Sequence, residues 1–217
     1  GFEKDYLSAK KQMEKGRYDS AISKLVKLID DKKITDRERG FAAVLLSKAY
    51  LGDGRGALAV KCLEDLEIGR PPEYFIALGE ARLAVGDYAN AVKSSAFYNV
   101  KDDAVLFYMA LWVSARGRLG IKDYLNCISD LGRIISEVPK IYEYEKDDEL
   151  KSLVMRAEEL LKKVKELYET ERYGNDYVNY RKGREAEFAG EYREAIKFYE
   201  KIRSGTLKDA GRCYTGH

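Results

Sequence analysis

The sequence predicts an all-α protein built from repeated helix-turn-helix units. Of its 217 residues, 45% are hydrophobic and 35% are charged, whereas only three are prolines. This is too much apolar material for a disordered chain and too little turn punctuation for a β-sandwich, so long helices are expected. The second observation is internal repetition, which sets the order of the predicted helices.

Three near copies of one pattern place a tyrosine two residues after a glycine and an alanine three residues after the tyrosine. The copies begin at Gly16, Gly86 and Gly190, and a small residue precedes each alanine by twelve positions. Large side chains do not fit where two helices cross closely, so the small residue and the alanine predict a crossing, with the glycine in the turn between. The pairs are Ala9 with Ala21, Gly79 with Ala91, and Gly183 with Ala195.

Two further copies are less regular. One pairs Ser47 with Ala59, and Gly56 stands in place of its tyrosine. The other pairs Ala110 with Cys127 at a separation of 17 residues, which predicts five inserted residues around Gly117 to Ile121. With these two, the repeated pattern accounts for most of the first two thirds of the chain.

As a set, these motifs resemble the tetratricopeptide repeat (TPR) family, whose unit is a helix-turn-helix of roughly 34 residues. The resemblance covers residues 3–138 and 175–203 and implies a right-handed TPR-like α-solenoid. We expect four TPR-like helix pairs over residues 1–139, a long helix with its connections over 140–174, and a C-terminal TPR-like unit over 175–217. The last of these includes a partial further helix after Ile202.

Residues 148–172 depart from the repeat. Their apolar side chains recur with a seven-residue rhythm on one face, which predicts one long interrupting helix. This stripe either packs on the solenoid core or forms the seam of a homodimer, and the pattern leaves both open. The stripe consists of Leu150, Leu153, Val154, Ala157, Leu160, Leu161, Val164, Leu167 and Tyr168.

Catalysis and cofactor binding find little support in the sequence. The single histidine is His217, at the last position, which excludes an acyl-transfer triad. Cys62, Cys127 and Cys213 are far apart and lack metal-ligand spacing, so neither a metal site nor a disulfide framework is expected. The GDGRG segment at residues 52–56 falls on a helix-to-helix turn and lacks Gly-Lys-Ser/Thr, so phosphate binding is not expected. We therefore expect no enzyme activity and no cofactor.

Charge and aromatic content argue against two further classes. The 39 basic and 37 acidic residues are interspersed and give a net charge of +2, so no nucleic-acid partner is expected. No apolar stretch approaches the roughly 20 residues of a membrane-spanning helix, so no direct membrane insertion is expected. The tyrosines after the turns and Trp112 are predicted to be core residues rather than stacking platforms for bases or ligands. Those tyrosines are Tyr18, Tyr88, Tyr124 and Tyr192.

Candidate partner-binding residues follow from the resemblance, because the first helices of a TPR-like solenoid line its concave face. Two rows point into that face, one three positions before each small residue and one a single position after it. Apolar anchors bordered by charges suit recognition of a helix or an extended peptide. The first row is Tyr6, Val44, Ile76, Phe107 and Tyr180, and the second is Lys10, Lys48, Glu80, Leu111 and Arg184. Alternatively, the helix over 148–172 fills this groove.

The sequence therefore predicts a non-enzymatic scaffold or adaptor that binds a partner peptide or helix on its concave face. The alternative is a self-assembling structural subunit, a homodimer through residues 148–172, for example of a cell-envelope complex. Because the chain opens at Gly1 without an initiator methionine, both a cytoplasmic and an exported or periplasmic protein remain open.

Overall fold

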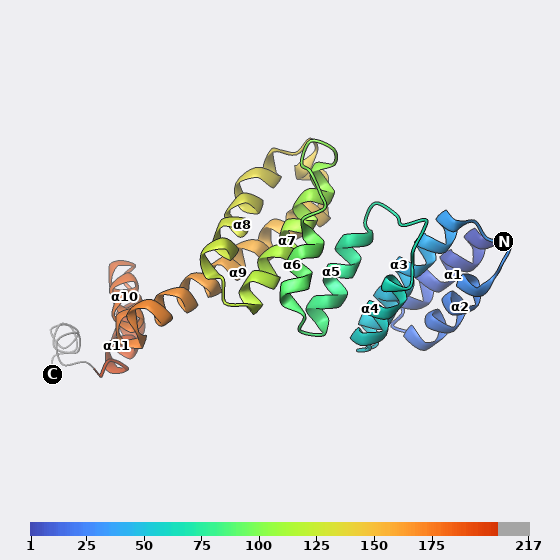
Figure 1. The fold of residues 1–217 in the computed structure, drawn as a ribbon. Coiled ribbons are helices and arrows are strands. Elements are labelled where there is room, and N and C mark those ends of the chain that lie inside the picture. The colour runs from blue at the N-terminus through green and yellow to red at the C-terminus, as the bar shows by residue number, and fades with distance from the viewer. Residues whose placement is uncertain (204–217) are drawn as a thin grey trace. The chain divides into compact units, whose positions relative to one another are not determined.

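The computed structural model describes residues 1–203, and all the regular elements in this range are helices (Figure 1). The predicted all-α class is confirmed for this part of the chain. Its α-helices are α1 (Phe2–Glu14), α2 (Tyr18–Asp30), α3 (Asp36–Gly52), α4 (Gly56–Glu64), α5 (Tyr74–Ala84), α6 (Tyr88–Ser95), α7 (Ala104–Gly120), α8 (Tyr124–Glu137), α9 (Asp148–Tyr173), α10 (Asn175–Phe188) and α11 (Tyr192–Glu200). Two short 3-10 helices, η1 (Val138–Lys140) and η2 (Tyr144–Lys146), lie between α8 and α9.

Contacts divide the chain into two compact units, Gly1–Glu158 and a second unit that begins at Glu159. In the first unit each helix from α1 to α7 packs against its successor, and α1, α3, α5 and α7 also contact one another in that order. In the second unit α10 packs against α11. The long helix expected over residues 148–172 is observed as α9.

Five helix pairs are closed by the same turn: α1 with α2, α3 with α4, α5 with α6, α7 with α8, and α10 with α11. The residue two positions beyond the first helix has a φ between 61° and 78°, the left-handed region that favours glycine. In all five turns the next N–H donates to the carbonyl five residues earlier, at 2.8–2.9 Å. The left-handed residues are Gly16, Gly54, Gly86, Lys122 and Gly190.

At the fourth turn the structure differs from the sequence prediction. The predicted insertion around residues 117–121 is wrong, because α7 continues to Gly120 and then makes the same turn as the other pairs. Lys122 occupies the left-handed position without being a glycine, and this hides the turn in the sequence. Ala115, twelve residues before Cys127, is fully buried like Cys127 itself. The small residue of this pair is therefore Ala115 and not Ala110.

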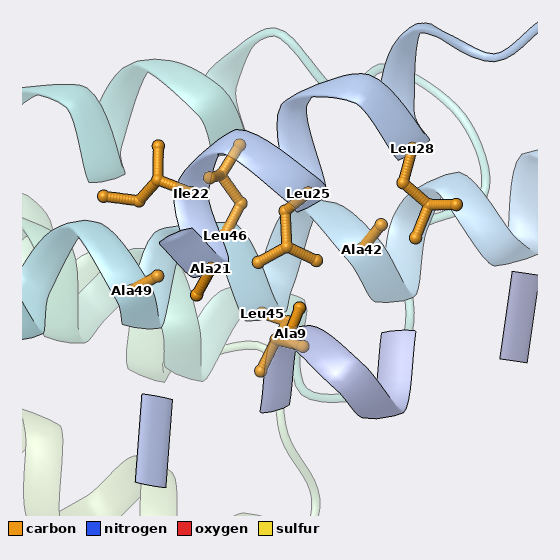
Figure 2. Packing of buried hydrophobic residues seen from close by; sticks show 9 residues of the cluster. All are labelled: Ala9, Ala21, Ile22, Leu25, Leu28, Ala42, Leu45, Leu46 and Ala49. Atoms are coloured by element: carbon orange, nitrogen blue, oxygen red, sulfur yellow. The ribbon is translucent and has the colours of Figure 1, made fainter. Parts of the chain in front are cut away.

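Small side chains lie where the helices cross. In the first three helices Ala9, Ala21 and Ala49 have no exposed surface, and Figure 2 shows them among the leucines and the isoleucine of the same cluster. At Gly79 of α5, an added Cβ would lie 2.6 Å from Cγ1 of Val113 on α7. Because Val113 is itself fully buried, the crossing of α5 and α7 has no space for a larger residue.

Two of the recurrent tyrosines set the fit between neighbouring helix pairs. The Tyr18 ring lies where a Cβ on Gly52, the last residue of α3, would be. The Tyr88 ring occupies the corresponding place beside Gly120, the last residue of α7. The tyrosine that begins the second helix of one pair is thus matched by a glycine that ends the first helix of the following pair.

Two of the helix pairs that lack this match between a tyrosine and a glycine follow the same geometry. Where Gly56 replaces the tyrosine at the start of α4, α5 ends on Ala84, and a Cβ on Gly56 would lie 3.4 Å from the Cβ of Ala84. Tyr192 begins α11, the last helix among residues 1–203, and is 66% exposed. The prediction of a core position is therefore wrong for Tyr192, and Tyr88 is only partly covered. The helix predicted after Ile202 lies outside the described residues, as do Cys213 and His217.

Candidate functional site

A pocket of about 400 Å³ lies between α5, α7 and the start of α9, all within the first unit. We call it the Trp112 pocket. Its apolar lining comes from three separate segments: Ile76 of α5; Val105, Met109 and Trp112 of α7; and Leu150 and Leu153 of α9. Its polar lining is Glu80, Asp147, Asp148, Glu149, Ser152 and Arg156.

Helix α7 supplies the most accessible apolar side chains. Val105, Met109 and Trp112 are four and three residues apart, so they share one face of the helix. Val105 and Met109 are 37% and 38% exposed, whereas Ile76 and Leu153 on the neighbouring helices are buried. The pocket thus has a buried base and a partly open apolar wall, an arrangement that can accept an apolar side chain.

Trp112 is held by an arginine on its own helix. Nη1 of Arg116 lies 3.0 Å from Oε2 of Glu80 on α5, and Nη2 of Arg116 contacts Oε1 of the same carboxylate. Cζ of Arg116 lies 4.7 Å from the centre of the Trp112 ring. A bidentate, charge-assisted pair has a defined geometry, and a guanidinium over an indole adds a cation–π attraction. Trp112 is therefore oriented relative to both α5 and α7.

A second arginine reaches Trp112 from α9. Cζ of Arg156 lies 5.5 Å from the centre of the Trp112 ring, while Nε of Arg156 donates to the Ser152 carbonyl. Arg156 is in no ion pair among residues 1–203. This contact connects the first turns of α9 with the pocket wall on α7.

The mouth of the pocket is acidic. Oδ1 of Asp147 accepts a hydrogen bond from the Leu150 N–H at 3.0 Å, so its carboxylate caps the start of α9. Asp148 and Glu149 are exposed and make no ion pair within the described part of the chain. These two carboxylates remain available to a cation from outside.

Of the ten predicted partner-binding residues, only Ile76 and Glu80 line this pocket. The predicted α7 residues have the wrong register, because their offsets start at Ala110 and not at Ala115. Phe107 lies instead beneath Arg133 of α8, whose Cζ is 5.0 Å from its ring centre, and Leu111 is half-buried. Counted from Ala115, the same offsets give Trp112 and Arg116. The twelve-residue spacing applied backwards from Cys127 was the signal that could have found both.

The predicted residues on α1 and α3 lie in different environments. Val44 is only 3% exposed and belongs to the core between α3, α4 and α5, so it is not an accessible anchor. Tyr6 is half-buried and stacks on Phe2, with the ring centres 5.6 Å apart. Burial, assisted by the charge of Glu73, raises the pKa of the Tyr6 hydroxyl. The side chains of Lys10 and Lys48 are exposed.

The two remaining predicted residues belong to the second unit. Tyr180 packs against the buried cluster of α10 and α11, which includes Tyr199. Arg184 is exposed, and its Nη1 lies 3.3 Å from Oε1 of Glu187. Oε1 of Glu187 also accepts a hydrogen bond from the Tyr199 hydroxyl at 3.2 Å. Tyr180 thus takes part in the internal packing of this unit, and Arg184 is paired with Glu187 at its surface.

Trp112 was expected in the core, and this prediction is wrong. Its side chain is half-buried and borders a pocket. The FYMALWV run is apolar because it serves two faces of α7. Val113 and Ala110 pack in the core, while Met109 and Trp112 face the pocket.

The apolar stripe of α9 is largely covered within the single chain. Leu150, Leu153 and Ala157 are buried in the first unit, and Val164 is fully buried in the second. Leu167, near the end of the stripe, is 46% exposed. The first turns of α9 therefore contribute to the Trp112 pocket instead of presenting a continuous apolar seam.

The described part of the chain offers no gathered metal ligands. Among residues 1–203, no three His, Cys, Asp or Glu side chains lie together as a metal ion would require. Burial raises the pKa of Cys62 to about 12, and it does the same to the pKa of Cys127. Both thiols therefore stay protonated at neutral pH. In the same range no helix has the length and apolar character needed to cross a membrane.

Comparison of the chain with family models and with curated proteins gives no match.

Proposed function

We propose that this chain is a TPR-like helical-repeat protein that acts as a non-enzymatic scaffold, with a peptide or helix of a partner protein seated in the Trp112 pocket. Support for the repeat comes from the five turns, which share one left-handed position and one hydrogen bond. With the register corrected at Ala115, a spacing of twelve relates the small residue to the alanine or cysteine in every pair. The resemblance to the TPR family implies that such repeats stack into a right-handed α-solenoid.

The observation that carries the proposed function is the pocket itself. Partner recognition depends on a few anchors in desolvated pockets, and tryptophan and arginine are enriched among them. Both Arg116 and Arg156 lie near the Trp112 ring, and Met109, whose apolar side chain is partly exposed, lines the same pocket. Trp112 and the two arginines are held by contacts within the chain, so a partner does not have to order them on binding.

A scaffold accounts for α9 better than a homodimer through its stripe does. A dimer seam requires the apolar stripe to be free in the monomer, yet Leu150, Leu153 and Ala157 are covered by the same chain. The same turns of α9 complete the wall of the pocket. Self-association through α9 would therefore have to break contacts that the pocket depends on.

The proposal is tested by selecting binders from a displayed library of random dodecapeptides against the full chain. Met109→Glu places a charge on the apolar wall, whereas Met155→Glu places one on α9 at an exposed position outside the pocket. We expect selected peptides to lose about 30-fold in affinity or more with Met109→Glu. Their affinity for the Met155→Glu control should remain within about twofold of the parent.

Circular dichroism confirms that both variants are folded before the affinities are compared. The proposal fails if the library yields no peptide that distinguishes Met109→Glu from Met155→Glu. It also fails if light scattering shows a dimer that only Met109→Glu dissociates, because the pocket would then belong to a self-association surface.

A further inference from the structure

We propose that the partner segment in the Trp112 pocket carries a lysine or arginine beside its apolar anchor, and that Asp148 and Glu149 receive this cation. The inference rests on the proposed function and specifies the chemistry of the partner. It follows from the balance of charges around the pocket and from the contacts that already use some of them.

Four carboxylates and one guanidinium belong to the pocket lining. Glu80 is neutralised by Arg116, which reaches it from outside that lining in a bidentate pair. Within the pocket lining, Asp147, Asp148 and Glu149 are then opposed only by Arg156, so two negative charges remain in excess there. An apolar peptide without a cation would leave these charges uncompensated beside its anchor, whereas a basic residue would meet them.

The start of α9 does not reverse this balance. A helix N-terminus carries the equivalent of roughly half a positive charge. The carboxylate of Asp147 already accepts the N–H of Leu150 there, and Asp148 and Glu149 lie in the first turn of the same helix. The carboxylates therefore outweigh the helix dipole, and the field at this mouth of the pocket favours a cation over an anion.

The two arginines at Trp112 determine where the cation of the partner can lie. Arg116 and Arg156 already lie near the Trp112 ring, so a further guanidinium or ammonium over this ring would meet two like charges. The apolar wall formed by Val105 and Met109 carries no charge and suits the apolar anchor. The favourable position for the cation is thus the acidic mouth on α9, with the anchor against α7.

The test uses the peptides selected from the dodecapeptide library that depend on Met109. Asp148→Asn together with Glu149→Gln removes both charges with little change of shape. The matched control is Glu158→Gln together with Glu159→Gln, two exposed carboxylates on the same helix outside the pocket. Fluorescence anisotropy with labelled synthetic peptides gives the affinities, at low and at physiological salt.

We expect the selected peptides to share an apolar residue next to lysine or arginine, and Asp148→Asn with Glu149→Gln to weaken them about tenfold. The control pair should change affinity by less than about twofold, and added salt should weaken the parent more than the double variant. Selected peptides that depend on Met109 but are acidic or uncharged would overturn this inference and leave the proposed function standing. Peptides insensitive to Met109→Glu would instead overturn the proposed function.

Discussion

Replacing Gly79 with alanine tests the close approach of α5 and α7. The new Cβ would lie 2.6 Å from Cγ1 of Val113, a distance that real Cβ contacts do not show. Val113 is fully buried, so its side chain cannot move outward into solvent. Overpacking of this kind costs about 1–3 kcal/mol, whereas glycine to alanine inside a helix gains about 1 kcal/mol.

Gly132 provides the matched control, because it also lies inside a helix but has no atom within 4 Å of an added Cβ. Gly132→Ala should therefore show the helix gain without the clash. The two variants are expected to differ by about 1–3 kcal/mol, or about 2–12 °C in melting temperature for a domain of this size. Thermal unfolding followed by circular dichroism measures the difference. Gly79→Ala as stable as Gly132→Ala would show that the two helices do not cross as closely as described.

Three further outcomes follow from individual side chains. Lys122→Gly should stabilise the protein by about 1 kcal/mol, because it removes the strain of a non-glycine residue in the left-handed backbone region. A loss of stability in a denaturant titration would contradict the assigned turn. Cys62 and Cys127 should be alkylated far more slowly at pH 8 in the native protein than in guanidinium. Burial raises the pKa of each thiol to about 12, so both thiols stay protonated in the native protein. Equal alkylation rates, measured by mass spectrometry, would refute this. Phe107→Ala should keep the affinity for the selected peptides within about twofold of the parent, whereas Trp112→Ala should lower it about 30-fold. The reverse order would support the register counted from Ala110.

The sequence predicted the helices well where a local rule determines them. Glycines mark four of the five turns, and Gly79 shows where the small side chains must lie. The rule failed at Lys122, since a lysine carries no sign that its backbone is left-handed. Because of that one residue the predicted register of α7 is wrong, and the pattern points to Phe107 in place of Trp112.

The pocket could be predicted only in part, because its walls come from segments far apart in the sequence. Ile76 and Glu80 follow from the repeat, and Trp112 and Arg116 follow once the register is right. The contribution of α9 does not, because a heptad stripe shows that a face is apolar but not what covers it. The acidic mouth of the pocket depends on where α9 begins relative to α7, which no local pattern encodes.

The most direct measurement of the central claim uses the fluorescence of Trp112, the one tryptophan in the chain. A selected peptide without tryptophan is titrated into the protein while emission and peptide anisotropy are recorded together. We expect the emission to change and to saturate at the same midpoint as the anisotropy, and we expect both responses to be lost in Met109→Glu and kept in Met155→Glu. Saturable binding by anisotropy with unchanged Trp112 emission would contradict the claim that partners bind in this pocket.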